Sequence, residues 1–184
     1  MNARLASLSL VSALGLASTA GAAEKSAPER HGFVGGGALG GGVITAGCDG
    51  CDVHGAIGID LHLGGMLTPR LALLFDASGA TSYSTEFAPT RYVASLLYAG
   101  AAQYFVTQRL WIKGGVGIAR VVQSDAPLFE TFESETGFGF LVAGGYELLQ
   151  RGSFALDAQI AVSPAFYAGT SVTDAVALVG VNWY

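Results

Sequence analysis

The sequence predicts an all-β protein, an eight-stranded antiparallel up-and-down transmembrane β-barrel with an N-terminal signal peptide. Three observations lead to this fold class. The 184 residues include 27 glycines and are 51% hydrophobic but only 12% charged. Apolar residues recur at every second position, as in half-buried strands. The connections alternate between tight turns and longer polar stretches. This composition excludes a disordered chain, which needs more charge, and the net charge of -5 argues against a nucleic-acid partner.

The N-terminus has the pattern of an export signal. Arg4 supplies a positive charge, Leu5 to Ala17 form an apolar stretch, and Ala20, Gly21 and Ala22 provide small residues for cleavage. The apolar run is too short to span a bilayer comfortably. The predicted organisation is therefore a signal peptide over residues 1–22, a polar leader over 23–31 and the barrel over 32–184.

The first four predicted strands follow the leader. A glycine-rich stretch over 32–45 opens the barrel. In 56–65, Ile57, Ile59, Leu61 and Leu63 share one face, and Gly58, Asp60, His62 and Gly64 share the other. The segment 70–78 alternates in the same way, and so does 92–104, where one face holds Tyr92, Ala94, Leu96, Tyr98, Gly100, Ala102 and Tyr104.

The last four strands repeat the pattern. The segment 110–118 carries Leu110, Ile112, Val116 and Ile118 on one face, and 138–148 carries Phe138, Phe140, Val142, Tyr146 and Leu148. The segment 154–162 places Phe154, Leu156, Ile160 and Val162 together, and 172–184 completes the set. None of these segments has the 3.6-residue period of a helix.

The connections predict an up-and-down meander. Tight turns are expected at 68–69, 107–108 and 150–152, which contain turn-forming residues and carry or precede Arg70, Arg109 and Arg151. Longer polar stretches lie at 46–53, 84–90, 123–136 and 167–171. The long stretches carry seven of the 14 acidic residues, whereas the tight turns carry three arginines, so we expect the loop end to face outward.

The non-apolar faces distinguish two kinds of eight-stranded barrel. A lipocalin-type carrier places its apolar face inside, whereas a transmembrane barrel places that face in lipid. A water-exposed face would be rich in Lys, Glu and Thr. In this chain the non-apolar face of the strands is instead dominated by Gly, Ala and Ser. Small residues suit the inside of a narrow barrel, and aromatic residues near strand ends suit the membrane interfaces. The pattern favours the transmembrane form.

With these features the chain resembles the small outer-membrane β-barrels of Gram-negative bacteria, the class that includes outer membrane proteins A and X. The resemblance rests on the export signal, the eight alternating segments, the short turns and a terminal strand ending in Trp183 and Tyr184. It implies residence in the bacterial outer membrane and recognition of Trp183 and Tyr184 by the barrel-assembly machinery. It also implies contact of the acidic loop end with lipopolysaccharide through bridging cations. Family members usually end in Phe with a second aromatic two positions earlier, so the adjacent pair departs from that pattern.

Strand parity places a polar network inside the barrel. Its expected members are Asp60, His62, Asp76, Gln103, Lys113, Glu147, Asp157, Gln159 and Asn182. Charges in a low-dielectric interior must be paired. From their similar distance to a tight turn, we expect Lys113 to bridge Glu147 or Asp157 and so to close the lumen. A merely solvated polar lumen is the alternative.

The first long stretch contains Cys48 and Cys51, spaced as Cys-Asp-Gly-Cys. In an exported chain with two cysteines, a local disulfide is the expected state. A metal site with Asp49, Asp52 and His54 and a redox centre are the alternatives. No metal and no cofactor are expected.

An enzymatic role is not expected, because spacing places no serine beside His54 or His62 as a hydrolase would require. The glycines alternate within strands and do not form a phosphate-binding loop. The sequence therefore predicts a monomeric barrel with a structural or surface-interaction role in the cell envelope and no wide pore. A narrow channel for ions or small solutes and an exported lipocalin-like carrier are the alternatives.

Overall fold

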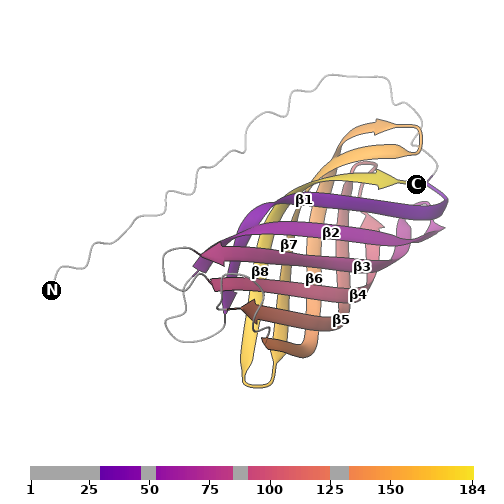
Figure 1. Ribbon diagram of the computed structural model, residues 1–184. Helices are drawn as coiled ribbons and strands as arrows, with labels where there is room; N and C mark the ends of the chain where they lie inside the picture. The colour runs from indigo at the N-terminus through magenta and orange to yellow at the C-terminus, as the bar shows by residue number, and fades with distance from the viewer. Residues whose placement is uncertain (1–29, 47–52, 85–90, 125–132) are drawn as a thin grey trace.

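A computed structural model describes residues 30–46, 53–84, 91–124 and 133–184, and in it these residues form a closed antiparallel barrel (Figure 1). Each strand pairs with its neighbours in sequence, and β1 also pairs with β8 to close the sheet. This confirms the predicted fold class. The strands are β1 Gly32–Ala46, β2 Val53–Thr68, β3 Leu71–Ser84, β4 Arg91–Phe105, β5 Leu110–Ser124, β6 Glu133–Arg151, β7 Phe154–Tyr167 and β8 Thr170–Trp183.

The turn end of the barrel, defined by the β2–β3, β4–β5 and β6–β7 connections, is built as the sequence predicts. In two turns a threonine hydroxyl accepts the backbone N–H groups that follow it. Thr68 Oγ1 lies 3.1 Å from Leu71 N, and Thr107 Oγ1 lies 2.9 Å from Leu110 N. In the third turn Gly152 adopts φ of +60°, which favours glycine. These local contacts explain why each reversal is short.

At the loop end several strands are longer than the alternation predicts. β3 runs on to Ser84, β5 to Ser124, and β6 begins at Glu133. The connection predicted at 167–171 as a longer polar stretch is a tight turn between Tyr167 and Thr170, with Gly169 at φ of +88°. The polar residues there continue the strand ladder, since backbone pairing does not depend on apolar side chains.

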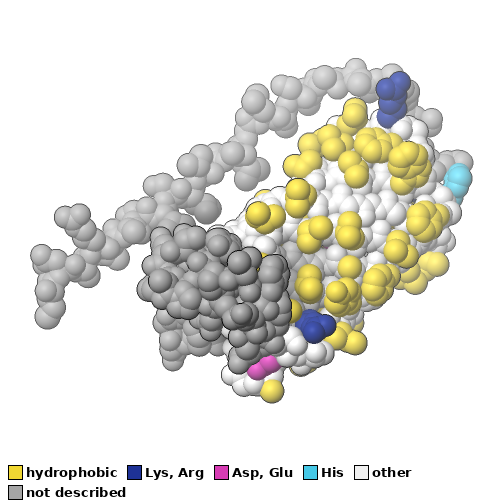
Figure 2. Space-filling model, in the orientation of Figure 1, with side chains coloured by type: hydrophobic (Ala, Val, Ile, Leu, Met, Phe, Trp, Pro, Cys, Tyr) yellow, Lys and Arg dark blue, Asp and Glu magenta, His cyan; other side chains and the backbone are white. Residues whose placement is uncertain are grey.

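The outer face of the barrel is apolar. Figure 2 shows hydrophobic side chains over the strands in view, with few charged groups among them. Every strand contributes, and the following outward residues are each at least 43% exposed: Leu39, Ile59, Leu73, Tyr98, Ile112, Phe140, Ile160 and Val179. An apolar surface that continues around the whole circumference far exceeds the patches of a few hundred Å² usual for monomers in water.

The inner face is packed with small and polar side chains. Ala72, Ala99, Ala119 and Ala155 are each at most 1% exposed. Larger apolar residues such as Leu97, Leu141 and Val176 fill much of the space between them. Among the residues described, the structure contains no helix long and apolar enough to cross a membrane.

Candidate functional site: polar side chains inside the barrel

The nine residues expected inside the barrel are all buried, at 7% exposure or less. They come from seven strands, β2 to β8, because each strand presents alternate residues to the interior. Gln103 lies opposite Lys113 in the β4–β5 ladder, and Gln159 lies opposite Gly145 in the β6–β7 ladder. The other seven divide between two groups of contacts, which we call the central network and the mouth cluster.

The central network consists of Asp60, His62, Asp76, Lys113, Asp157 and Asn182. Lys113 Nζ donates to Asp60 Oδ2 and to Asp76 Oδ2, both at 2.6 Å. The Lys113 side chain is fully buried with both carboxylates. Such short charge-assisted contacts are among the stronger hydrogen bonds in proteins. Lys113 therefore forms ion pairs with two acidic groups, one on β2 and one on β3, in the barrel interior.

His62 links this ion pair to β8, which only β1 separates from β2 in the closed sheet. Its Nδ1 lies 2.7 Å from Asp60 Oδ1, and its Nε2 lies 2.8 Å from Asn182 Oδ1. Asn182 Nδ2 in turn donates to Asp157 Oδ2 at 2.6 Å. The two partners of the imidazole are an oxygen of the Asp60 carboxylate and the oxygen of the Asn182 amide. The chain of contacts thus joins β2, β7 and β8.

Asp60, His62 and Asp76 also form the one possible metal-binding group found among the described residues. Their ligand atoms lie within 4.8 Å of one another. Carboxylate and imidazole donors are suitable ligands for several divalent metals. However, Lys113 Nζ already contacts both carboxylates at 2.6 Å. The ammonium group therefore takes the place that a metal cation would need.

The expected bridge from Lys113 to Glu147 or Asp157 is wrong. In the β5–β6 ladder Lys113 faces Ala143, four residues before Glu147. Asp157 is the register partner of Glu147, so it too lies away from the level of Lys113 along the barrel. The prediction counted residues from the turns and ignored the stagger between tilted strands, which a closed barrel requires. In the narrow lumen the lysine instead reaches across to β2 and β3.

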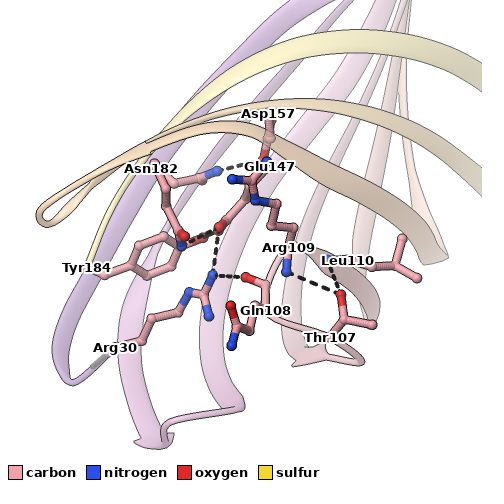
Figure 3. Close-up of polar contacts among 10 residues, drawn as sticks. Arg30, Thr107, Gln108, Arg109, Leu110, Glu147, Asp157, Asn182 and Tyr184 are labelled. Atoms are coloured by element: carbon pink, nitrogen blue, oxygen red, sulfur yellow. Dashed lines mark hydrogen bonds and ion pairs between the residues drawn. The ribbon is translucent and has the colours of Figure 1, made fainter. Parts of the chain in front are cut away.

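The mouth cluster lies at the turn end and consists of Arg30, Phe105, Glu147, Gln150, Tyr184 and the carbonyl of Gln108. Figure 3 shows Arg30, Tyr184 and Glu147 converging beside Gln108. An Arg30 nitrogen donates to Glu147 Oε2 and to the Gln108 carbonyl, both at 2.6 Å. The Arg30 guanidinium also stacks 3.9 Å from the centroid of the Phe105 ring. Arg30, assigned by sequence to the polar leader, is therefore part of the barrel interior.

The last two residues point in opposite directions. Trp183 continues the outward row of Val179 and Val181, whereas the Tyr184 hydroxyl donates to Glu147 Oε1 at 2.8 Å inside the mouth. Burial, together with the nearby Glu147 carboxylate, raises the pKa of the Tyr184 hydroxyl well above its usual range. The hydroxyl therefore stays protonated and remains a donor. This geometry explains why two aromatic residues stand side by side at the end of the sequence.

Sequence reasoning missed two buried charges. Arg30 was overlooked because it lies just before the first alternating segment. Asp174 on β8 is only 2% exposed and lies opposite Ser163 in the β7–β8 ladder. Its position has the same parity as that of Asn182, so the strand pattern contained the signal for it. Cys48, Cys51 and residues 1–29 lie outside the described residues.

No protein-family model matches the sequence, and no curated protein matches it. Several solved structures share its fold. One is Ail, the attachment invasion locus protein of Yersinia pestis, in complex with the heparin analogue sucrose octasulfate. It has a TM-score of 0.60 at 12% identity, over 83% of this chain and 99% of that chain. Another is Neisserial surface protein A, with a TM-score of 0.54 at 16% identity over 82% and 95% of the two chains. The likeness confirms the resemblance to small bacterial barrels at the level of fold.

Proposed function

We propose that this protein is a monomeric barrel of the bacterial outer membrane with a structural or surface-interaction role and no open pore. The continuous apolar outer face carries the proposal, because its exposure to water would cost roughly 25 cal/mol for each Å² that lipid would otherwise cover. The opposite arrangement, an apolar interior and a polar exterior, would suit a lipocalin-like carrier. Buried charges such as Asp76 and Lys113 are found instead on the inner face.

Several contacts support a closed lumen. The two ion pairs of Lys113 and the mouth cluster around Glu147 lie inside the barrel. Apolar side chains such as Leu97 and Leu141 fill other parts of the interior. An eight-stranded barrel is only wide enough for its own side chains. A non-enzymatic role fits His62, whose two ring nitrogens already contact Asp60 and Asn182.

Membrane fractionation tests the proposed location. The mature protein should be recovered with the outer membrane and should show a folded band on gels that changes mobility on boiling. Recovery of a folded protein from the soluble periplasmic fraction would overturn the proposal. The extracted protein should be a monomer. Its insertion in the cell should depend on the barrel-assembly machinery, and its lipid partner in the outer leaflet should be lipopolysaccharide.

A narrow cation channel is the second candidate, and the charge of the lumen favours it. Among the described residues, the only buried Lys or Arg side chains are Arg30 and Lys113. Five carboxylates are buried: Asp60, Asp76, Glu147, Asp157 and Asp174. An acidic lumen attracts cations and repels anions. Planar-bilayer recordings distinguish the candidates, since a closed barrel gives near-zero current and a channel gives steps whose reversal potential in a salt gradient indicates cation selectivity.

A further inference from the structure

We infer that the mouth of the barrel is a preformed guanidinium-binding site, and that Arg30 occupies it to dock the N-terminal segment of this same chain. The side chain of Arg30 is 4% exposed although the residue precedes β1. Burying a charge so completely is costly unless it is paired and hydrogen-bonded. The mouth provides both kinds of contact, and it does so with groups from distant parts of the sequence.

The walls of the site are held in place by contacts that do not involve Arg30. Phe105 N donates to the Arg70 carbonyl at 2.8 Å, Glu147 N donates to the Arg109 carbonyl at 2.9 Å, and Tyr184 N donates to the Ser153 carbonyl at 2.8 Å. Each wall is therefore tied to a different tight turn. A binding site whose groups are already fixed loses little conformational entropy when it is occupied.

The chemistry of the walls selects a guanidinium over an ammonium group. Arg30 is stacked on Phe105 at 3.9 Å and lies 5.2 Å from the centroid of the Tyr184 ring. One of its terminal nitrogens reaches two acceptors, Glu147 Oε2 and the Gln108 carbonyl. A planar cation can stack on a ring and donate from its edge at the same time, whereas an ammonium group cannot combine the two contacts in this way.

Trypsin cleavage after Arg30 tests the docking directly, because the enzyme must take this side chain into its own pocket. The experiment uses the folded protein in detergent micelles, so its outcome does not depend on the cellular location proposed above. Wild-type protein should resist cleavage of the Arg30–His31 bond. In Glu147→Gln this bond should be cleaved at least about tenfold faster. The substitution removes a charge-assisted hydrogen bond to Arg30, so the state in which Arg30 has left the mouth becomes more populated.

A matched control is Glu135→Gln, the same chemical change at an exposed position of the same strand. It should leave Arg30 protected. Gel mobility before and after boiling reports whether each variant is folded. Equal cleavage of wild-type and Glu147→Gln proteins, both folded, would overturn the inference.

Competition on the wild-type protein keeps the inference testable if Glu147→Gln does not fold. Added ethylguanidinium should compete with Arg30 and speed cleavage of the Arg30–His31 bond while the barrel stays folded. Ethylammonium at the same concentration should have a much smaller effect. Equal effects of the two cations, or no effect of ethylguanidinium, would contradict a guanidinium-selective site.

Discussion

Glu147 and Asp157 face each other as register partners across the β6–β7 ladder, inside the barrel. Like charges placed directly opposite on neighbouring strands destabilise a sheet by roughly 0.2–1 kcal/mol. The two carboxylates have different environments. Glu147 is paired with the Arg30 guanidinium and accepts from Tyr184, whereas Asp157 accepts from the neutral amide of Asn182.

This difference predicts opposite effects of two neutralising substitutions. Asp157→Asn removes a repulsive charge and retains an oxygen for Asn182, so we expect the free energy of unfolding to rise by up to about 1 kcal/mol. Glu147→Gln leaves Arg30 buried without its counter-ion and should lower the free energy of unfolding by several kcal/mol. Urea unfolding in detergent, followed by tryptophan fluorescence, measures both. Destabilisation of similar size in the two variants would contradict this assignment.

Lys113 is expected to be the most sensitive residue of the central network. Lys113→Met has a side chain of similar length but leaves Asp60 and Asp76 buried without the cation that both contact, which should cost about 3–5 kcal/mol. Arg70→Met, at an exposed turn position, should change the free energy of unfolding by no more than about 0.5 kcal/mol. The unfolding midpoints of the two variants provide the comparison. A Lys113→Met protein as stable as wild type would exclude an essential ion pair.

Gly36 has no side chain, and His62 and Asn182 meet in the space that a side chain at this position would occupy. A Cβ at this position would lie 2.5 Å from Asn182 Oδ1 and 2.6 Å from His62 Nε2. Gly36→Ala should therefore displace both side chains and destabilise the barrel by about 1–3 kcal/mol. Gly41→Ala, on the outer side of the same strand, meets only a backbone oxygen at 3.7 Å and serves as control. Equal unfolding midpoints for the two alanine variants would argue against the predicted clash.

The outer face gives a prediction that depends on lipid. Val116 is 56% exposed near the middle of β5. Val116→Arg should destabilise the folded protein in bilayers by about 2–4 kcal/mol, the cost of an arginine at the hydrocarbon midplane. The same arginine at Leu110, at the turn-end start of β5, should cost at most about 1 kcal/mol. Unfolding in vesicles measures both values, and equal costs would show that β5 is not inserted at the expected depth.

The sequence predicted all eight strands and the parity of their faces, because both depend on local alternation and on turn residues such as Gly152. It did not predict the partner of Lys113, which depends on the stagger between β5 and its neighbours. That stagger is a property of the closed sheet and is not visible within any one segment. Arg30 was missed for a related reason, since its burial depends on walls supplied by residues more than seventy positions away in the sequence.

The two ends of the described chain meet at one point of the barrel. With an even number of antiparallel strands, β1 begins and β8 ends at the turn end, where Arg30 and Tyr184 bind different oxygens of Glu147 (Figure 3). Because the sheet is closed and the two ends of the described chain lie together, joining them and opening the chain at another turn would keep the order of the strands around the barrel. A circular permutant with a short peptide joining Tyr184 to Arg30 and new termini at the Pro69 turn would keep every neighbouring pair of strands.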